Sequence, residues 1–412
     1  MVRIALISDI HFGKDARTME FSVPGESCGG NTEGAASLTD GLVDVLQSMN
    51  VEYIFVAGDL TSVGSPQEFF YCEKKLIEII NRVNIPIDNL IVGVGNHDID
   101  WKIAKLSEGY QNGASEETVQ IVKNGYDRIA GNASLYNLNS IGAQRYLNER
   151  GDIPFTGVIE REDFILFILN SGWCCTPEKL GGMLTQQQVE WFREQASRYR
   201  DDQRWKIVML HHHPRAYENP IKTKNKENIS LLEEGAELIN IAGEYHIDLI
   251  LHGHRHHPRA ETMCVGDWDY PVAFICAGSL SVSPIDRNGG DIPNTLHIIE
   301  LADNPRAIYL YNYEYSSGSG WIRSTNFRQD NPMDYIMLLG CSFRIEERRR
   351  AIIELAATHG SNEIVWAELD DCLKSLSAEK LLKMMIETLA DTHRVTGEFF
   401  RNPVYILDKK LL

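Results

Sequence analysis

Residues that can bind metal ions or transfer protons follow five apolar stretches of this sequence. In chain order the five sets are Asp9 with His11, Asp59, Asn96 with His97, the run His211–His213, and His254 with His256. Carboxylate, imidazole and carboxamide groups together suit manganese, iron, zinc, nickel or cobalt. The nitrogen-rich set disfavours calcium, and the absence of thiolates at these positions disfavours structural zinc. We therefore expect one metal centre built from distant parts of the chain.

Each set stands at the end of an apolar run that is typical of a buried strand, as Leu90–Val94 is before Gly95. Alternate residues of an extended segment point the same way, so Asp9 and His11 can approach one ion together. Gly95 allows the chain to turn sharply after its strand. Loops at the carboxyl edge of an α/β sheet gather binding groups, so we expect the five sets to meet there.

Helices are expected between the first three strands. Apolar residues at helical spacing predict a helix over 39–49. Ser65, Pro66 and Glu68 provide an N-cap, a first-position proline and a capping box for a second helix that ends near Asn84. Strand–helix alternation with short links predicts a parallel sheet covered by helices.

Strands dominate after Gly151, with a further helix starting at Thr185 and another over 231–244. The apolar runs 272–277, 296–301 and 307–315 follow with little helix between them. We therefore expect the second half of this region to form a mostly antiparallel or mixed second sheet, packed on the first.

Three segments depart from this pattern. Residues 101–150 are polar and leave from just beyond Asn96 and His97, so we expect an insertion that caps the site. The Ser- and Gly-rich stretch 316–333 is expected to be a linker, which makes 1–315 one domain. Residues 334–412 are expected to form a mainly helical C-terminal domain. Its arginines, balanced by two glutamates, predict a solvated face, with contact to an acidic partner or nucleic acid as the alternative: Arg344, Arg348, Arg349 and Arg350.

Composition restricts the function further. The chain has 412 residues and a net charge of −18, which argues against sequence-blind binding of duplex nucleic acid through a basic face. Eight cysteines without CxxC pairs suggest buried thiols in a reducing compartment. No apolar run approaches the roughly 18 residues that span a bilayer, and the first strand begins at once. We expect a cytoplasmic protein.

The ordered motifs D-x-H, G-D, G-N-H-D, H and G-H-x-H resemble the calcineurin-like metallophosphoesterase superfamily over roughly residues 1–315. The resemblance implies an α/β fold, a four-layer α/β/β/α sandwich, here with a small helical C-terminal domain. It also implies two divalent transition-metal ions, with manganese the first expectation. One ion would be held by Asp9, His11, Asp59 and His256, and the other by Asn96, His212 and His254, with Asp59 bridging.

The assignment of His212 rests on the H-x-P spacing before Pro214 in this family. Strand alternation points His212 one way and its two neighbours the other, so His211 stays open as the alternative. Histidines 252 and 257 are expected to support the site rather than bind metal.

Two ions about 3.5–4 Å apart can activate a water and clamp phosphoryl oxygens for in-line attack. His97 is then expected to protonate the leaving oxygen, with Asp98 orienting it. Arg255 and Arg215 are expected to bind the substrate phosphate, with a solvated arginine as the equal alternative at each position.

The expected activity is hydrolysis of a nucleotide or another small phosphodiester. Tyr53–Asp59 lacks the G-D-x-V-D-R-G form of the phosphoprotein phosphatases, and Asn170-Ser171 stands where relatives often carry an aspartate. A nuclease of the same fold is the alternative, with residues 334–412 as a module that binds nucleic acid or another partner. A non-catalytic scaffold is a third hypothesis, in which the C-terminal domain binds a protein or mediates oligomerisation.

Overall fold

The computed structural model describes residues 2–30, 36–99, 155–173, 175, 181–216, 231–265, 270–283, 292–303, 306–323, 337–339, 343–359, 363–374, 376–390, 392–398 and 404–409. The expected cap at 101–150 lies outside the described residues and stays a prediction. No helix in the described ranges combines the length and apolar character needed to cross a bilayer.

The first sheet contains the strands that carry the N-terminal motifs. Its strand order is β12-β11-β10-β1-β2-β3, with β13 paired to β11. The bounds are β1 (Val2–Ile7), β2 (Tyr53–Ala57), β3 (Leu90–Gly93), β10 (Asn294–Asp303), β11 (Arg306–Ser316), β12 (Gly320–Arg323) and β13 (Met337–Leu339). Strands β1, β2 and β3 are parallel, so their carboxyl ends lie at one edge.

The second sheet has the strand order β4-β5-β6-β7-β9-β8. Its bounds are β4 (Gly157–Glu160), β5 (Phe164–Ile168), β6 (Trp205–Met209), β7 (Leu249–His252), β8 (Arg259–Val265) and β9 (Tyr270–Cys276). The inner strands β5, β6, β7 and β9 are parallel, and the edge strands β4 and β8 are antiparallel to their neighbours. The sheet is therefore mixed, as expected.

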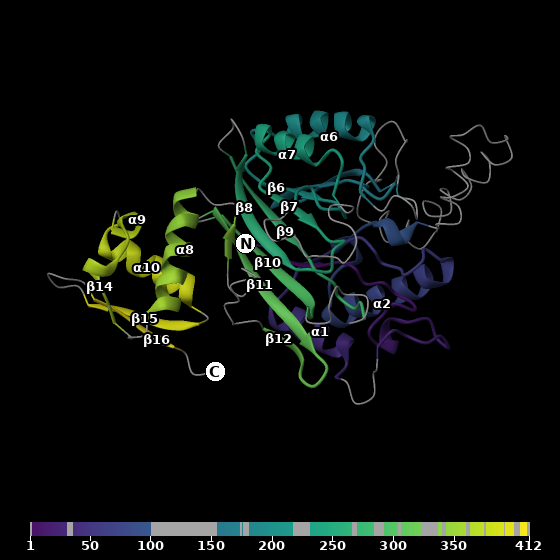
Figure 1. Ribbon diagram of the computed structural model, residues 1–412, viewed down its shortest axis with the longest axis horizontal. Helices are drawn as coiled ribbons and strands as arrows, with labels where there is room; N and C mark the ends of the chain where they lie inside the picture. The colour runs from purple at the N-terminus through teal and green to yellow at the C-terminus, as the bar shows by residue number, and fades with distance from the viewer. Residues whose placement is uncertain are drawn as a thin grey trace.

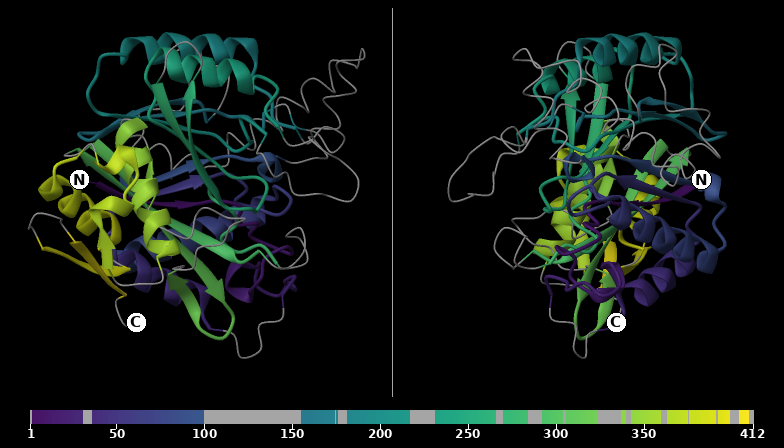
Figure 2. Two further views of the ribbon diagram at one scale, coloured as in Figure 1. Left: turned by 60° about the vertical axis from the view of Figure 1, so that its left-hand side comes forward. Right: turned by 90° about the vertical axis from the view of Figure 1, so that its right-hand side faces the viewer.

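Helices cover the outer face of each sheet. Helices α1 (Leu38–Ser48) and α2 (Pro66–Val83) pack on the first sheet, and α6 (Gln186–Arg198) and α7 (Gly235–Glu244) on the second. A third apolar core fills the space between the sheets. Figures 1 and 2 show α6 and α7 on the opposite side of the two sheets from α1 and α2. The predicted four-layer sandwich is confirmed.

Strands β10 and β11 do not lie where the sequence pattern placed them. We expected both in the second sheet, but β10 pairs antiparallel with β1 and β11 follows it in the first sheet. An apolar run shows that a strand is buried on both faces and does not show which sheet it joins. The expected linker also contains β12, which pairs with β11.

The C-terminal residues form a separate small core of helices and strands. Its elements are α8 (Phe343–Thr358), β14 (Glu363–Val365), α9 (Asp371–Lys374), α10 (Ala378–Leu389), β15 (His393–Glu398) and β16 (Val404–Lys409). The three strands make a sheet of order β14-β16-β15, which the sequence analysis did not predict. These elements, yellow-green to yellow in Figures 1 and 2, gather beside the first sheet. We call them the C-terminal unit.

Arg349 ties the C-terminal unit to the sandwich. Contrary to the expected solvated face, Arg349 of α8 is buried. Its Nη2 lies 3.2 Å from Glu387 Oε2 on α10, and its Nη1 donates to the hydroxyl of Tyr309 on β11 at 3.3 Å. The guanidinium carbon lies 5.6 Å from the centre of the Tyr309 ring. One side chain therefore joins α8, α10 and the first sheet.

Replacing Arg349 with Met should loosen the C-terminal unit. Loss of the ion pair leaves Glu387 without its buried partner, and because Glu387 is partly exposed we expect a cost of about 2 kcal/mol. Amide hydrogen exchange should be faster across 343–409, whereas an Arg350→Met control at an exposed position should leave it unchanged. Equal exchange in the two variants would show that Arg349 is not an anchor.

Candidate metal centre

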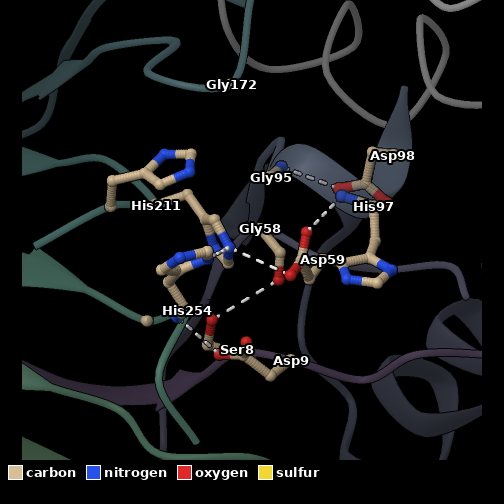
Figure 3. Close-up of polar contacts among 12 residues, drawn as sticks. Ser8, Asp9, Gly58, Asp59, Gly95, His97, Asp98, Gly172, His211 and His254 are labelled. Carbon is tan, nitrogen blue, oxygen red and sulfur yellow. Dashed lines mark hydrogen bonds and ion pairs between the residues drawn. The ribbon is translucent and has the colours of Figure 1, made fainter. Parts of the chain in front are cut away.

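The polar sets that follow β1, β2, β3, β6 and β7 converge at one edge of the sandwich (Figure 3). Asp59, after β2 in the first sheet, faces His211, after β6 in the second. Asp59 Oδ2 lies 3.0 Å from His211 Nε2 and 3.5 Å from His11 Nε2. Asp59 therefore lies between groups contributed by both sheets.

One group of possible ligands contains Asp9, His11 and His256. Asp9 Oδ1 lies 3.2 Å from His256 Nε2 and 4.0 Å from His11 Nε2. The three ligand atoms lie within 4.8 Å of one another, which is close enough for a single ion. The second carboxylate oxygen of Asp9 accepts a hydrogen bond from the backbone N–H of His254 at 3.0 Å.

A second group contains Asp59, His211 and His254. His254 Nδ1 lies 3.2 Å from His211 Nε2, and the three ligand atoms again lie within 4.8 Å of one another. Asn96, the predicted carboxamide ligand, is buried at the first residue of the short helix Asn96–Asp98. The adjacent backbone N–H of His97 donates to Asp59 Oδ1 at 2.8 Å, which places this turn against the bridging carboxylate.

The backbone is strained where these side chains emerge. Nine non-glycine residues among those described have φ in the left-handed region, and five of them are predicted ligands. These five are Asp9 at 50°, His11 at 48°, Asp59 at 52°, His254 at 79° and His256 at 55°. Such conformations cost on the order of 1–3 kcal/mol each and cluster at functional sites. The surrounding fold must therefore offset this strain at one edge of the sandwich.

Two glycines allow the carboxylates their positions. A Cβ on Gly95 would collide with the carboxylate of Asp59, which lies 2.8 Å away at Cγ. A Cβ on Gly253 would lie 2.6 Å from Asp9 Oδ2 and would also collide with the Ser8 hydroxyl. Any side chain at either position would displace a predicted metal ligand.

The electrostatics of the cluster favour a bound cation. Burial disfavours a charged His211, but the Asp59 carboxylate outweighs burial and raises the pKa of His211 to about 9. Burial also opposes ionisation of Asp59, yet His211, His97 and His11 hold the pKa of Asp59 well below its usual range. Burial lowers the pKa of His254 well below its usual range, and the nearby His212 and His211 lower it further. Positive charge is therefore stabilised beside Asp59, and His254 is kept neutral as a ligand requires.

The chemistry of the donor set fits divalent ions. Both ring nitrogens of His11 are buried and make no hydrogen bond among the described residues, although Nε2 points at two carboxylates. An imidazole with an unused lone pair next to two carboxylates is suited to coordinating a metal. Asp9, His11 and His256 would hold one ion, Asp59, His211 and His254 the other, and Asp59 would be shared.

The structure places His211, not His212, in the cluster. His211 Nδ1 lies 2.8 Å from the carbonyl oxygen of Ala57, so it must carry the proton, and Nε2 faces Asp59. His212 instead bonds through Nδ1 to Ser171 Oγ at 2.9 Å and lies with Nε2 3.7 Å from Cys175 Sγ. The geometry therefore favours the alternative that strand alternation had left open. Motif spacing favours His212, whereas the distances to Asp59 and His254 favour His211 as the ligand, and β6 ends at Met209, before the run begins.

His97 is oriented by a backbone carbonyl rather than by Asp98. His97 Nδ1 lies 2.9 Å from the carbonyl oxygen of Ser62 and must donate to it. The carboxylate of Asp98 instead accepts hydrogen bonds from the backbone of Gly95 at 2.8 Å and of Thr61 at 3.0 Å. Burial, reinforced by the Asp59 charge, raises the pKa of Asp98 to about 7. Asp98 thus fixes the loops that carry Asp59 and His97.

The two candidate phosphate-binding arginines, Arg215 and Arg255, differ in their surroundings. Arg215 lies 3.4 Å from Glu261 Oε1 and 3.3 Å from Met263 Sδ, so it is engaged with β8. Arg255 is half-buried, and burial lowers its pKa. Its positive charge contributes to lowering the pKa of the buried His213.

Sequence reasoning missed the part played by Ser171. Its hydroxyl lies 3.3 Å from the backbone nitrogen of His211 and 3.1 Å from that of His212, and it accepts both hydrogen bonds. Ser171 thus fixes the turn that aims one histidine at Asp59 and the other away. Its place just after β5 was the available signal.

Sequence comparison identifies a family to which most of the chain is similar. A sequence profile described as calcineurin-like phosphoesterase matches residues 2–258. Among proteins with curated descriptions, none matches the chain.

Two of the solved structures that match the chain are described as phosphatases. A dimetal phosphatase from Danio rerio is 11% identical with a TM-score of 0.45, and the match covers 78% of this chain and 98% of that one. The purple acid phosphatase PPD1 from yellow lupin is 13% identical with a TM-score of 0.44, and the match covers 78% of this chain. This chain spans about half the length of the lupin enzyme, 53%.

Replacement of His211 and of His212 by Ala should affect metal content differently. The His211 variant loses a ligand of the shared group and should retain about one ion per chain, whereas the His212 variant should retain two. Inductively coupled plasma mass spectrometry on manganese-loaded protein measures both. Loss of metal from the His212 variant alone would restore the assignment made from the motif.

Metal affinity should rise with pH up to about 9. With a pKa of about 9, His211 carries a proton at neutral pH without metal, and an ion must displace it. Binding that releases one proton strengthens by about tenfold per pH unit below that pKa. Calorimetric titration with manganese at pH 6.5, 7.5 and 8.5 should show this trend. An affinity independent of pH would contradict the placement of His211 as a ligand.

Proposed function

Because the chain belongs to the calcineurin-like phosphoesterase family, we propose that it is a phosphodiesterase that hydrolyses a nucleotide or another small phosphodiester. Members of this family are metal-dependent phosphoric ester hydrolases, and this chain has the candidate ligand clusters for two ions. We propose manganese as the ion in the cell, since carboxylate, carboxamide and imidazole donors suit it. When bound, two divalent ions supply a nucleophile at neutral pH and offset phosphoryl charge.

The observation that carries the proposal is the position of His97. Its ring centre lies 4.4 Å from that of His11, and the residue is partly exposed at the edge of the cluster. Since Nδ1 donates to Ser62, a second proton can reside only on Nε2. A protonated His97 can therefore donate from Nε2 to the oxygen that leaves when the phosphoester bond breaks. A binding scaffold would have no use for such a group.

The charge around the cluster favours a diester over a monoester. A phosphate monoester carries about −1.5 to −2 charges at pH 7, whereas a diester carries one. Arg215, one of two candidate cationic partners, is turned toward Glu261 and Met263. A singly charged diester needs fewer cationic side chains beyond the two ions than a monoester does.

We propose a cytoplasmic location. Cys72, Cys175 and Cys276 are free thiols buried among apolar residues. Burial raises the pKa of the Cys276 thiol to about 12. Free, unreactive cysteines are typical of a reducing compartment.

Replacing His97 with Ala should lower turnover of bis-para-nitrophenyl phosphate by about 10²–10⁴-fold, because proton donation to the leaving group is lost. Metal content should stay at two ions per chain, since His97 is not required as a ligand. Turnover of the monoester para-nitrophenyl phosphate by the wild-type protein should be lower than that of the diester. Preferential cleavage of the monoester would reject the phosphodiesterase assignment, and an unchanged rate would remove His97 from the mechanism.

A further inference from the structure

The C-terminal unit has the connectivity of a helix–turn–helix module with an attached hairpin. Its elements follow the order α8, β14, α9, α10, β15, β16, and its sheet has the antiparallel order β14-β16-β15. Strands β15 and β16 form the hairpin, and α10 packs against both β15 and α8. This is a winged-helix arrangement, in which the last helix is presented beside a β-hairpin.

Helices α9 and α10 form the helix–turn–helix pair. Only three residues separate Lys374, the last residue of α9, from Ala378, the first of α10. Ser377 caps α10 by accepting a hydrogen bond from the backbone of Lys380, and buried Leu373 and Leu381 join the two helices in one core. A short turn of this kind presents the second helix to the major groove of DNA. We propose that the C-terminal unit binds duplex DNA through α10.

The outward face of α10 has the side chains that this role requires. Glu379, Lys380, Lys383 and Ile386 are all exposed, with 78% of the Lys383 side chain and 44% of Ile386 accessible. Lysine bonds to guanine and phosphate oxygens, glutamate accepts from the cytosine amino group, and an apolar side chain contacts the thymine methyl. Glu387, the other acid of this helix, is paired with Arg349 at 3.2 Å, and its second oxygen lies 3.9 Å from Lys383 Nζ.

Most of the net negative charge of the chain lies outside the C-terminal unit. Residues 343–412 contain 11 Lys and Arg against 12 Asp and Glu, whereas residues 1–342 contain 29 against 46. The sequence-wide charge that argues against nucleic acid is therefore located in the sandwich. Lys380 and Lys383 supply the positive charge of this face beside Glu379, so we expect few phosphate contacts and a weak dependence of affinity on salt.

Acidic residues limit where the DNA can lie. Asp370 and Asp371 are exposed at the start of α9 and would repel phosphates there. Contact is thus confined to α10 and its surroundings. The inference rests on the C-terminal unit alone and holds whether or not the metal centre cleaves the bound DNA.

The test is selection from a pool of random-sequence duplexes of 30 base pairs with the full-length protein, without added metal. Enriched duplexes are then titrated by fluorescence anisotropy at several salt concentrations. The double variant Lys380→Ala, Lys383→Ala should bind at least tenfold more weakly at low salt. It should also reduce the slope of log K against log salt by about 1.8, from about 0.9 per phosphate contact. The double variant Asp370→Asn, Asp371→Asn should bind more tightly.

Two controls separate a lost contact from a lost fold. Lys75→Ala, at a lysine on α2 paired with Glu78, should leave binding unchanged. The lysine variant of α10 should hydrolyse bis-para-nitrophenyl phosphate at the wild-type rate and retain its circular dichroism. Failure of hydrolysis in the wild type would count against the proposed enzyme and not against DNA binding.

Three results would overturn the proposal. The pool does not become enriched, or the lysine variant binds an enriched duplex as tightly as the wild type. In the third, sedimentation shows that the chain is a dimer dissociated by Ile386→Glu while no duplex binds. That last result would assign the same face of α10 to a second copy of the chain.

Discussion

The contact between Asp59 and His211 is the constraint on which the rest of this structure depends. It joins a carboxylate after β2 in one sheet to an imidazole after β6 in the other, over 3.0 Å with both residues buried. The two sheets must therefore end at the same edge and at the same height. The apolar core between the sheets supports that relation.

Local conformations that would be unfavourable elsewhere are accepted at this edge. Five predicted ligands adopt left-handed backbone angles, and Gly95 and Gly253 leave room for carboxylates that no other residue would allow. Strain of this kind persists only where the surrounding fold over-determines it. The parallel strands on both sides supply that support.

The sequence was sufficient for features encoded within one segment and insufficient for those that depend on tertiary pairing. Four apolar runs each predict a strand with polar residues at its end, namely those that end in Asp9, Asp59, Asn96 and His254. The layers and most of the site could therefore be predicted. The pairing partner of β10 could not be predicted, because a strand buried on both faces has the same apolar pattern in either sheet. The choice between His211 and His212 depends on hydrogen bonds that Ser171 and Ala57 accept, one of them at a backbone carbonyl that no sequence motif records. The pattern at 393–398 and 404–409 was too short and too polar to separate a hairpin from loop.

The Arg349 anchor and the pairing of β13 with β11 have a mechanical consequence. A domain on a flexible linker samples many positions, and its effective concentration near a second site depends on the length and stiffness of the linker. Here the Arg349 side chain and strand β13 hold the C-terminal unit in a fixed orientation relative to the metal centre. A molecule bound by α10 would therefore be held at one distance and one angle from the metal centre.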